Sequence, residues 1–287
     1  MSERSAESIR VADAVDAAIQ PCAFLLELSG DWIVHRASEN CDKLLGDSHV
    51  TMVGEPLSRF IQAEALHDLR NLFSRLSGST GTARAYRVRL TDDRPRFDIA
   101  FQIAEGGVLL EGIPSADQGL GESFGAVGGL AAGLAGASGK ALLESAARRM
   151  RALTGFDRAT LLRGRNKATS SRSGVPFPPG ANASLSAQLP MLIADQHARP
   201  VPVFPHGPSR VAAKALFRAP TAEECAALAD RSIASTMRVP VAIDGKQLGE
   251  FRCAHVTARR PSLEMHAAAE LFAQMVAMRL AMEGSGA

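Results

Sequence analysis

The chain has 287 residues, of which 46% are hydrophobic and 22% are charged, a composition typical of a globular protein long enough for two domains. Its 32 basic and 30 acidic side chains are interspersed and give a formal net charge of +2, which excludes the basic stripe of a nucleic-acid-binding protein. No stretch is apolar enough for a signal peptide or a membrane span, and the four cysteines lack CxxC spacing. We therefore expect a cytoplasmic protein with reduced thiols, no structural zinc site, and neither nucleic acid nor membrane as a partner.

Residues 1–115 are predicted to form a first domain that mixes strands and small helices, after a short N-terminal arm. Apolar runs and turn residues indicate strands at 23–28 and 32–35, helical spacing between 57 and 76, and further strands at 83–90, 96–103 and 107–112. Two strands, small helices and a three-stranded meander follow one another in the order of a PAS domain.

The composition changes at residues 116–139 to glycine, alanine and serine, with eight glycines between Gly119 and Gly139. Glycine weakens a helix interior, so we expect this segment to be a flexible linker or a loosely ordered segment rather than a stable helix. A phosphate-binding loop is disfavoured because the segment lacks the Gly-Lys-Ser/Thr ending of such loops.

Residues 140–284 are predicted to form a second domain, in which helices at both ends enclose several strands. Helices are expected at 140–153, 184–194, 221–230 and 263–282, and strands at 156–162, 233–243 and 247–255. Asp244-Gly245 is a hairpin turn signal, and Ser262 is placed to cap the last helix. This order is typical of a GAF domain with helices on one side of an antiparallel sheet, so the expected fold class is α+β.

Short segments of both predicted domains point together to one family. They are 19–21, 24–28, 37–40 and 97–99 in the first domain, and 155–158, 233–237 and 248–255 in the second. In order and spacing they resemble the bacteriophytochromes, which hold an open-chain tetrapyrrole between a PAS and a GAF domain. The resemblance implies a sensory PAS–GAF module with a bilin such as biliverdin as its chromophore.

Several light-reactive positions of the family are replaced in this chain. Residues 1–18 contain no cysteine to form the thioether with biliverdin, and Cys22 stands where the family usually has a histidine. Cys22 is an alternative nucleophile, but free cysteines are more often small buried residues. The other replaced positions are Leu162, Gly164, Ser184, Glu224 and Ala254. We therefore expect a degenerate pocket without covalent attachment or red/far-red switching.

The side of the pocket that binds the ligand's carboxylates is better retained. By the resemblance, Arg199 and Arg218 coincide with the arginines that grip the tetrapyrrole propionates, a task suited to a guanidinium group. Thr236 and Arg238 lie on the strand that meets the other propionate. The remaining candidates are Ser184, which replaces an aspartate at the pyrrole nitrogens, and His255, the neighbour of a lost histidine. The alternative is that these arginines are ordinary surface residues.

The expected ligand is biliverdin or another linear tetrapyrrole, held non-covalently. Haem with His255 or Cys22 as an axial ligand is disfavoured, because a lone histidine on a strand more often has a structural role. The chain contains no HExxH motif, and no set of Ser, His and Asp residues stands out, so we do not expect an enzyme.

A second reading is a PAS–GAF interaction module whose pocket has closed. Met265, Met275, Met278 and Met282 give the last helix an apolar surface, and the family dimerises through this helix and the one at 140–153. We expect a homodimer and a separate signalling partner, for example a haem oxygenase. The segment between Arg199 and Arg218 is shorter than in the family, so we also expect the N-terminal arm not to thread it.

Overall fold

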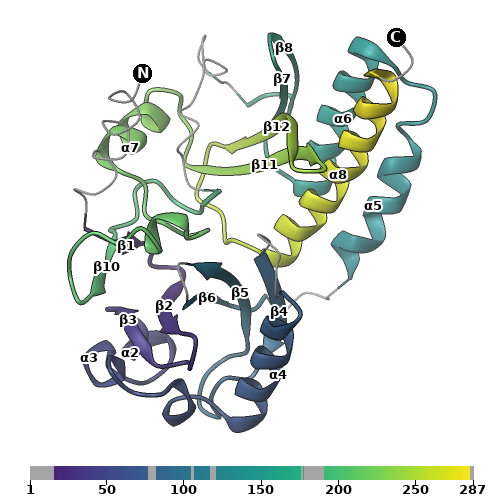
Figure 1. Ribbon diagram of the computed structural model, residues 1–287. Helices are drawn as coiled ribbons and strands as arrows, with labels where there is room; N and C mark the ends of the chain where they lie inside the picture. The colour runs from purple at the N-terminus through teal and green to yellow at the C-terminus, as the bar shows by residue number, and fades with distance from the viewer. Residues whose placement is uncertain are drawn as a thin grey trace, which may run out of the picture. The chain divides into compact units, whose positions relative to one another are not determined.

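The computed structural model describes residues 16–76, 82–104, 107–116, 121–175, 177 and 191–284, which form two compact units (Figure 1). Unit 1 contains the described residues up to Ser115 together with the segment Ala198–Ala219. Unit 2 contains those of Ala116–His197 and of Pro220–Ala287. Each unit combines one sheet of antiparallel strand pairs with helices, as the predicted α+β class requires.

Unit 1 is built on a sheet with the strand order β1-β10-β3-β2-β6-β5-β4. Its strands are β1 (Ala18–Ile19), β2 (Phe24–Ser29), β3 (Val34–Ser38), β4 (Thr82–Val88), β5 (Phe97–Ala104), β6 (Gly107–Pro114) and β10 (Val201–Phe204). Its helices are α2 (Cys41–Leu44), α3 (His49–Met52), η1 (Leu57–Arg59), α4 (Ala63–Ser74) and η2 (Ala212–Lys214). Phe24 and Phe97 meet edge to face in the core, with ring centroids 5.5 Å apart, and the chain's only tryptophan, Trp32, is buried there.

Strand β1 lies between the two ends of the segment Ala198–Ala219. On one edge Val203 donates its backbone N–H to the carbonyl of Ala17, at 2.9 Å. On the other edge Ala219 donates to Ala18, at 3.0 Å, and Ile19 forms a bridge with Arg218. Residues 17–19 thus pair with this segment on both edges. Residues 1–15 lie outside the described part of the chain, so the expectation that the arm does not thread the segment stays a prediction.

A buried carboxylate holds the same segment against strand β6. Glu111 accepts the backbone N–H groups of Leu216 and Phe217, each at 2.8 Å. Burial raises the pKa of Glu111 to about 7, although these two hydrogen bonds act in the opposite direction. The segment thus belongs to unit 1 through strand pairing and through a side chain of its sheet.

Unit 2 is built on a sheet with the order β8-β7-β12-β11-β9. Its strands are β7 (Arg158–Arg163), β8 (Asn166–Ser171), β9 (Leu192–Ile193), β11 (Ser235–Ile243) and β12 (Lys246–His255). Its helices are α5 (Glu122–Ala132), α6 (Gly139–Thr154), α7 (Ala222–Ala229) and α8 (Leu263–Gly284), of which α5, α6 and α8 lie side by side in Figure 1. Val239 and Phe251 face these helices, because Phe251 contacts Phe272 of α8 with ring centroids 6.2 Å apart.

Helix α5 corrects the prediction of a flexible linker at 116–139. Its glycines disfavour a helix in isolation, but Val127 and, just beyond the helix, Leu134 are buried within unit 2. The guanidinium of Arg149 on α6 also donates to the carbonyl of Leu130 at 2.9 Å. Tertiary packing therefore outweighs local propensity here.

The predicted helix at 184–194 is also corrected where the structure describes it. Leu192 and Ile193 form strand β9 and pair with Met237 and Thr236 of β11. Residues 184–190 lie outside the described part of the chain.

The predicted turn and caps of unit 2 are confirmed. Asp244 and Gly245 have φ angles of 49° and 74°, as a two-residue hairpin between β11 and β12 requires. Ser262 accepts the N–H of Met265 at 3.1 Å and so caps α8. In the described part of the chain, we find no helix with the length and apolar character needed to cross a membrane.

Candidate functional site

One face of the sheet of unit 2 is covered by α6 and α8, and we call the opposite face the open face because these two helices do not cover it. Several side chains of the open face are nevertheless buried. Side chains that lie directly opposite one another on paired antiparallel strands share a face. Thr236 lies opposite Ala254 and Ile193, and Arg238 lies opposite Arg252. These residues alternate with Val239 and Phe251 along the strands, so they belong to the open face.

One end of the open face is apolar. Its cluster of buried residues consists of Ile193, Leu228, Ile233 and Ala254, and the ring of Phe177 packs against it. The hydroxyl of Thr236 is buried beside this cluster, and it finds no hydrogen-bond partner among the described residues. A buried hydroxyl without a partner is costly, so this one is a candidate contact for a polar group of a ligand.

The other end of the open face is ionic. Glu250 places its Oε1 2.5 Å from Nη2 and 2.9 Å from Nε of Arg238. Its second oxygen, Oε2, lies 2.5 Å from Nε of Arg252. The three side chains carry one net positive charge, which makes this end of the face a candidate site for a carboxylate.

His255 is not on the open face. It lies opposite Ser235, in alternation with Ala254, and its Nδ1 is 2.7 Å from Oδ2 of the buried Asp157. Burial lowers the pKa of His255, and the charge of Asp157 opposes that shift only in part. The ring of His255 also contacts Phe156 edge to face, at 6.0 Å between centroids, so the described contacts of His255 are structural ones.

The two arginines predicted to grip propionates belong to unit 1. Arg199 is exposed, and the half-buried Arg218 donates from Nη1 to the carbonyl of Ala219 at 2.9 Å. Thr236 and Arg238 belong to unit 2, whereas Ser184 lies outside the described residues. Of the six candidate residues, the structure therefore brings Thr236 and Arg238 to one face, and the roles of all six stay predictions.

Two of the replaced family positions have ordinary structural surroundings. Burial raises the pKa of the Cys22 thiol to about 12, so it carries very little of the thiolate that a nucleophile requires. Glu224 accepts the N–H of Thr221 at 2.7 Å and completes the capping box at the start of α7. Neither position offers a reactive group to a ligand.

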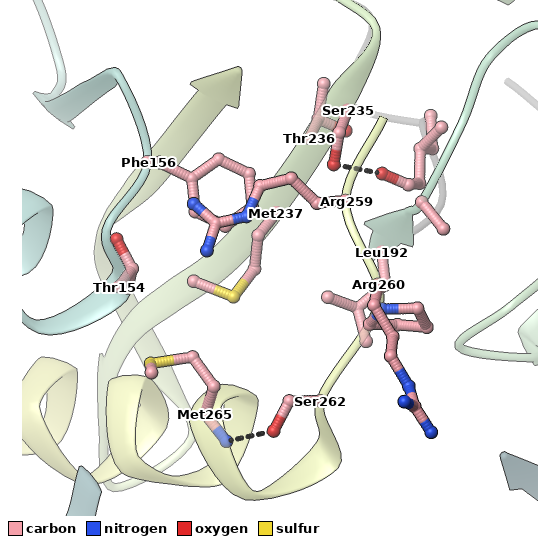
Figure 2. Close-up of a pocket in the computed structure, with 13 residues that line it drawn as sticks. Thr154, Phe156, Leu192, Ser235, Thr236, Met237, Arg259, Arg260, Ser262 and Met265 are labelled. Atoms are coloured by element: carbon pink, nitrogen blue, oxygen red, sulfur yellow. Dashed lines mark hydrogen bonds between the residues drawn. The ribbon is translucent and has the colours of Figure 1, made fainter. Parts of the chain in front are cut away.

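A small cavity lies on the helix side of the sheet (Figure 2). Its volume is about 90 Å³, and Phe156, Met237 and Met265 line it together with Arg259, whose guanidinium stacks 4.6 Å from the centroid of Phe156. Binding pockets for cofactor-sized molecules usually measure about 300 Å³ or more, so this cavity does not admit a tetrapyrrole. In the described ranges, no three His, Cys, Asp or Glu side chains gather as metal ligands.

Comparison with protein families identifies two domains along the chain. The profile of the GAF domain matches residues 139–283. The chain belongs to the GAF domain family. Ahead of that match, the profile of the PAS fold covers residues 7–112 of this GAF protein, which confirms the predicted order of PAS and then GAF. No curated protein sequence matches this GAF protein.

Solved structures resemble the GAF protein over almost its whole length. The chromophore-binding domain of an unusual bacteriophytochrome from R. palustris is 22% identical, with a TM-score of 0.76 over 94% of this chain and 97% of the other. The chromophore-binding domain of Stigmatella aurantiaca phytochrome P1 is 25% identical, with a TM-score of 0.75 over 92% and 95% of the two chains. A longer structure of the R. palustris protein, 21% identical with a TM-score of 0.80, matches 98% of this chain but only 61% of its own. The predicted phytochrome-like PAS–GAF fold is thereby confirmed.

On this face an apolar cluster lies beside the guanidinium of Arg238 and the unpartnered hydroxyl of Thr236, a combination that suits an apolar ligand with a carboxylate. Glu250 and Arg252 were missed by sequence reasoning. The signal was present, because a basic, acidic and basic residue occur at alternating positions of one hairpin: Arg238, Glu250 and Arg252.

Proposed function

We propose that this GAF protein is a phytochrome-like regulatory protein that binds biliverdin or a related linear tetrapyrrole non-covalently on the open face of its GAF sheet. The observation that carries the proposal is the adjacency of an apolar cluster, a buried unpartnered hydroxyl and the guanidinium of Arg238 on that face. A tetrapyrrole offers the complementary surfaces, since its rings are apolar and its propionates are acidic. That Arg199 and Arg218 grip a propionate stays a prediction from the family resemblance.

The same proposal excludes red/far-red switching. Such switching needs a protonated bilin and polar groups that exchange hydrogen bonds with the rotating ring. The positions of three of those groups are held by Leu162, Glu224 and Ala254, and Glu224 is engaged in capping α7. We propose that the protein reports ligand binding rather than light, and that it catalyses no reaction.

The test is co-expression with a haem oxygenase, followed by an absorption spectrum of the purified protein. We expect a visible bilin band that is released by denaturation and shows no reversible change under red and far-red light. Exchanging the exposed Arg199 for alanine should weaken binding, whereas Arg148→Ala, at an exposed position of α6, serves as the control. A photoreversible band would contradict the loss of switching, and a protein that never retains a bilin would contradict the binding site.

A second candidate function is a dimeric interaction module, and the surface of α8 favours it. Leu271, Met278 and Met282 are 37%, 48% and 66% exposed, although they are large and apolar. Such a surface is typical of a helix that packs against a partner. Light scattering should give the mass of a dimer for the wild type and of a monomer for Met278→Glu with Met282→Glu, while Val50→Glu, exposed in unit 1, should leave the dimer intact.

A further inference from the structure

The ionic end of the open face contains three charged side chains that contact one another. Arg238 comes from β11, and Glu250 and Arg252 come from β12, next to it in the sheet. The two carboxylate oxygens of Glu250 are divided between the guanidinium groups, one oxygen to each. Both arginines therefore already hold a carboxylate in the absence of any ligand.

The set is largely removed from water. The side chains of Arg238, Glu250 and Arg252 are only 12%, 8% and 18% exposed. Charges buried to this degree require partners, because the cost of desolvation has to be offset by close contacts. The contacts of Glu250 meet this requirement from within the chain for both guanidinium groups.

Glu250 also occupies the position beside Arg238 that the carboxylate of an acidic ligand would take. The set adjoins the apolar cluster and Thr236 on the same face, so a ligand seated on that cluster would bring its carboxylate to Arg238. We propose that Glu250 is an internal competitor for the ligand's carboxylate: it occupies Arg238 and Arg252 in the free protein and sets the affinity of the site for acidic ligands. This inference rests on the proposed tetrapyrrole site and names the residue that regulates it.

The competition has a chemical consequence that distinguishes it from simple structural pairing. When Glu250 pairs with both guanidinium groups, this end of the site contributes almost equally to the affinities of a diacid and of its neutral ester. When the charge of Glu250 is removed, both guanidinium groups lose a carboxylate partner that a diacid can replace, so the diacid gains affinity and the ester does not.

The experiment compares biliverdin with biliverdin dimethyl ester, titrated into the purified full chain and followed by visible absorption. We expect Glu250→Gln to tighten biliverdin binding about tenfold, the value of one hydrogen bond between charged groups, and to leave the ester unchanged. Exchanging Arg252 for glutamine as well should reverse the gain. The control Glu144→Gln removes the same charge from α6 and should change neither ligand.

The outcomes distinguish a failure of the role proposed for Glu250 from a failure of the proposed tetrapyrrole site. Equal affinities of the wild type and Glu250→Gln for biliverdin, or equal tightening of diacid and ester, would overturn the role of Glu250 and leave tetrapyrrole binding standing. No binding of either compound to any variant would instead remove the proposed function. If Glu250→Gln does not fold, Glu250→Asp replaces it: this side chain is one methylene shorter and cannot span both arginines, and an unchanged preference for the diacid would again overturn the role.

Discussion

At the scale of single residues, removing the hydroxyl of Thr236 tests whether this group contacts a ligand or stabilises the fold. Because it finds no partner among the described residues, Thr236→Val should leave the free energy of unfolding unchanged or raise it by about 1 kcal/mol. The same change should weaken tetrapyrrole binding several-fold. Thr160→Val is the matched comparison, since Thr160 shares the open face and its hydroxyl lies 3.1 Å from that of Thr169. It should lower stability by about 1 kcal/mol in urea unfolding followed by circular dichroism.

Glu111 predicts how the stability of unit 1 depends on pH. Its pKa is raised from 4.5 to about 7 in the folded protein, so the folded state binds the proton more tightly than the unfolded state. Its contribution to stability is complete below the lower value and is lost as the pH rises through the upper one. Relative to Glu111→Gln, the free energy of unfolding of the wild type should therefore fall by about 3 kcal/mol across this interval.

The fluorescence of Trp32 measures this effect, because the chain's single tryptophan is buried in the core of unit 1. Glu64→Gln, an exposed position on α4, serves as the control and should retain the pH dependence of the wild type. Parallel stability curves for the wild type and Glu111→Gln would contradict the raised pKa.

At the scale of elements, helix α5 shows how packing supports a sequence that disfavours a helix. A Cβ atom added at Gly129 meets nothing within 4 Å, so Gly129→Ala should stabilise the helix by about 0.5–1 kcal/mol. The same atom at Gly133 clashes with the guanidinium of Arg149 and would disturb its bond to the carbonyl of Leu130. Gly133→Ala should therefore bring no gain in thermal or urea unfolding. Equal gains from both variants would contradict this packing of α5.

The hairpin of β11 and β12 shows why the fold could be predicted while the ionic set could not. Asp244-Gly245 identifies the turn, and the alternating apolar residues identify both strands. An uninterrupted register from that turn would place Arg238 opposite Phe251. A bulge between Val241 and Ala242 shifts the register by one residue and places Arg238 opposite Arg252. Sequence patterns do not locate such a bulge, so the partners of Arg238 emerge only from the structure.

At the scale of the whole molecule, the division into units does not follow the order of the chain. The order of PAS and GAF was predictable because each half has its own pattern of strands and helices. The pairing of strand β10 was not predictable, because Val203 pairs with Ser38, a residue from the other half of the sequence. Local patterns carry no information about a partner so distant, and the membership of Ala198–Ala219 in unit 1 had to come from the three-dimensional contacts.

Because unit 1 contains a segment from the second half of the chain, we can predict how the protein behaves when the chain is cut between the two halves. With a protease site inserted after Ala116, the two cleaved fragments should remain together in gel filtration, because the second fragment supplies β10 and the partners of Glu111 to unit 1. The cut protein carrying Val203→Asp and Phe217→Asp should separate, since both side chains are fully buried in this segment and a buried unpaired carboxylate is costly. The uncut double variant shows whether each half still folds. Separation of the wild-type fragments after cleavage would contradict the assignment of the segment to unit 1. Retention of the doubly substituted fragments would mean that contacts outside Ala198–Ala219 suffice to hold the halves together.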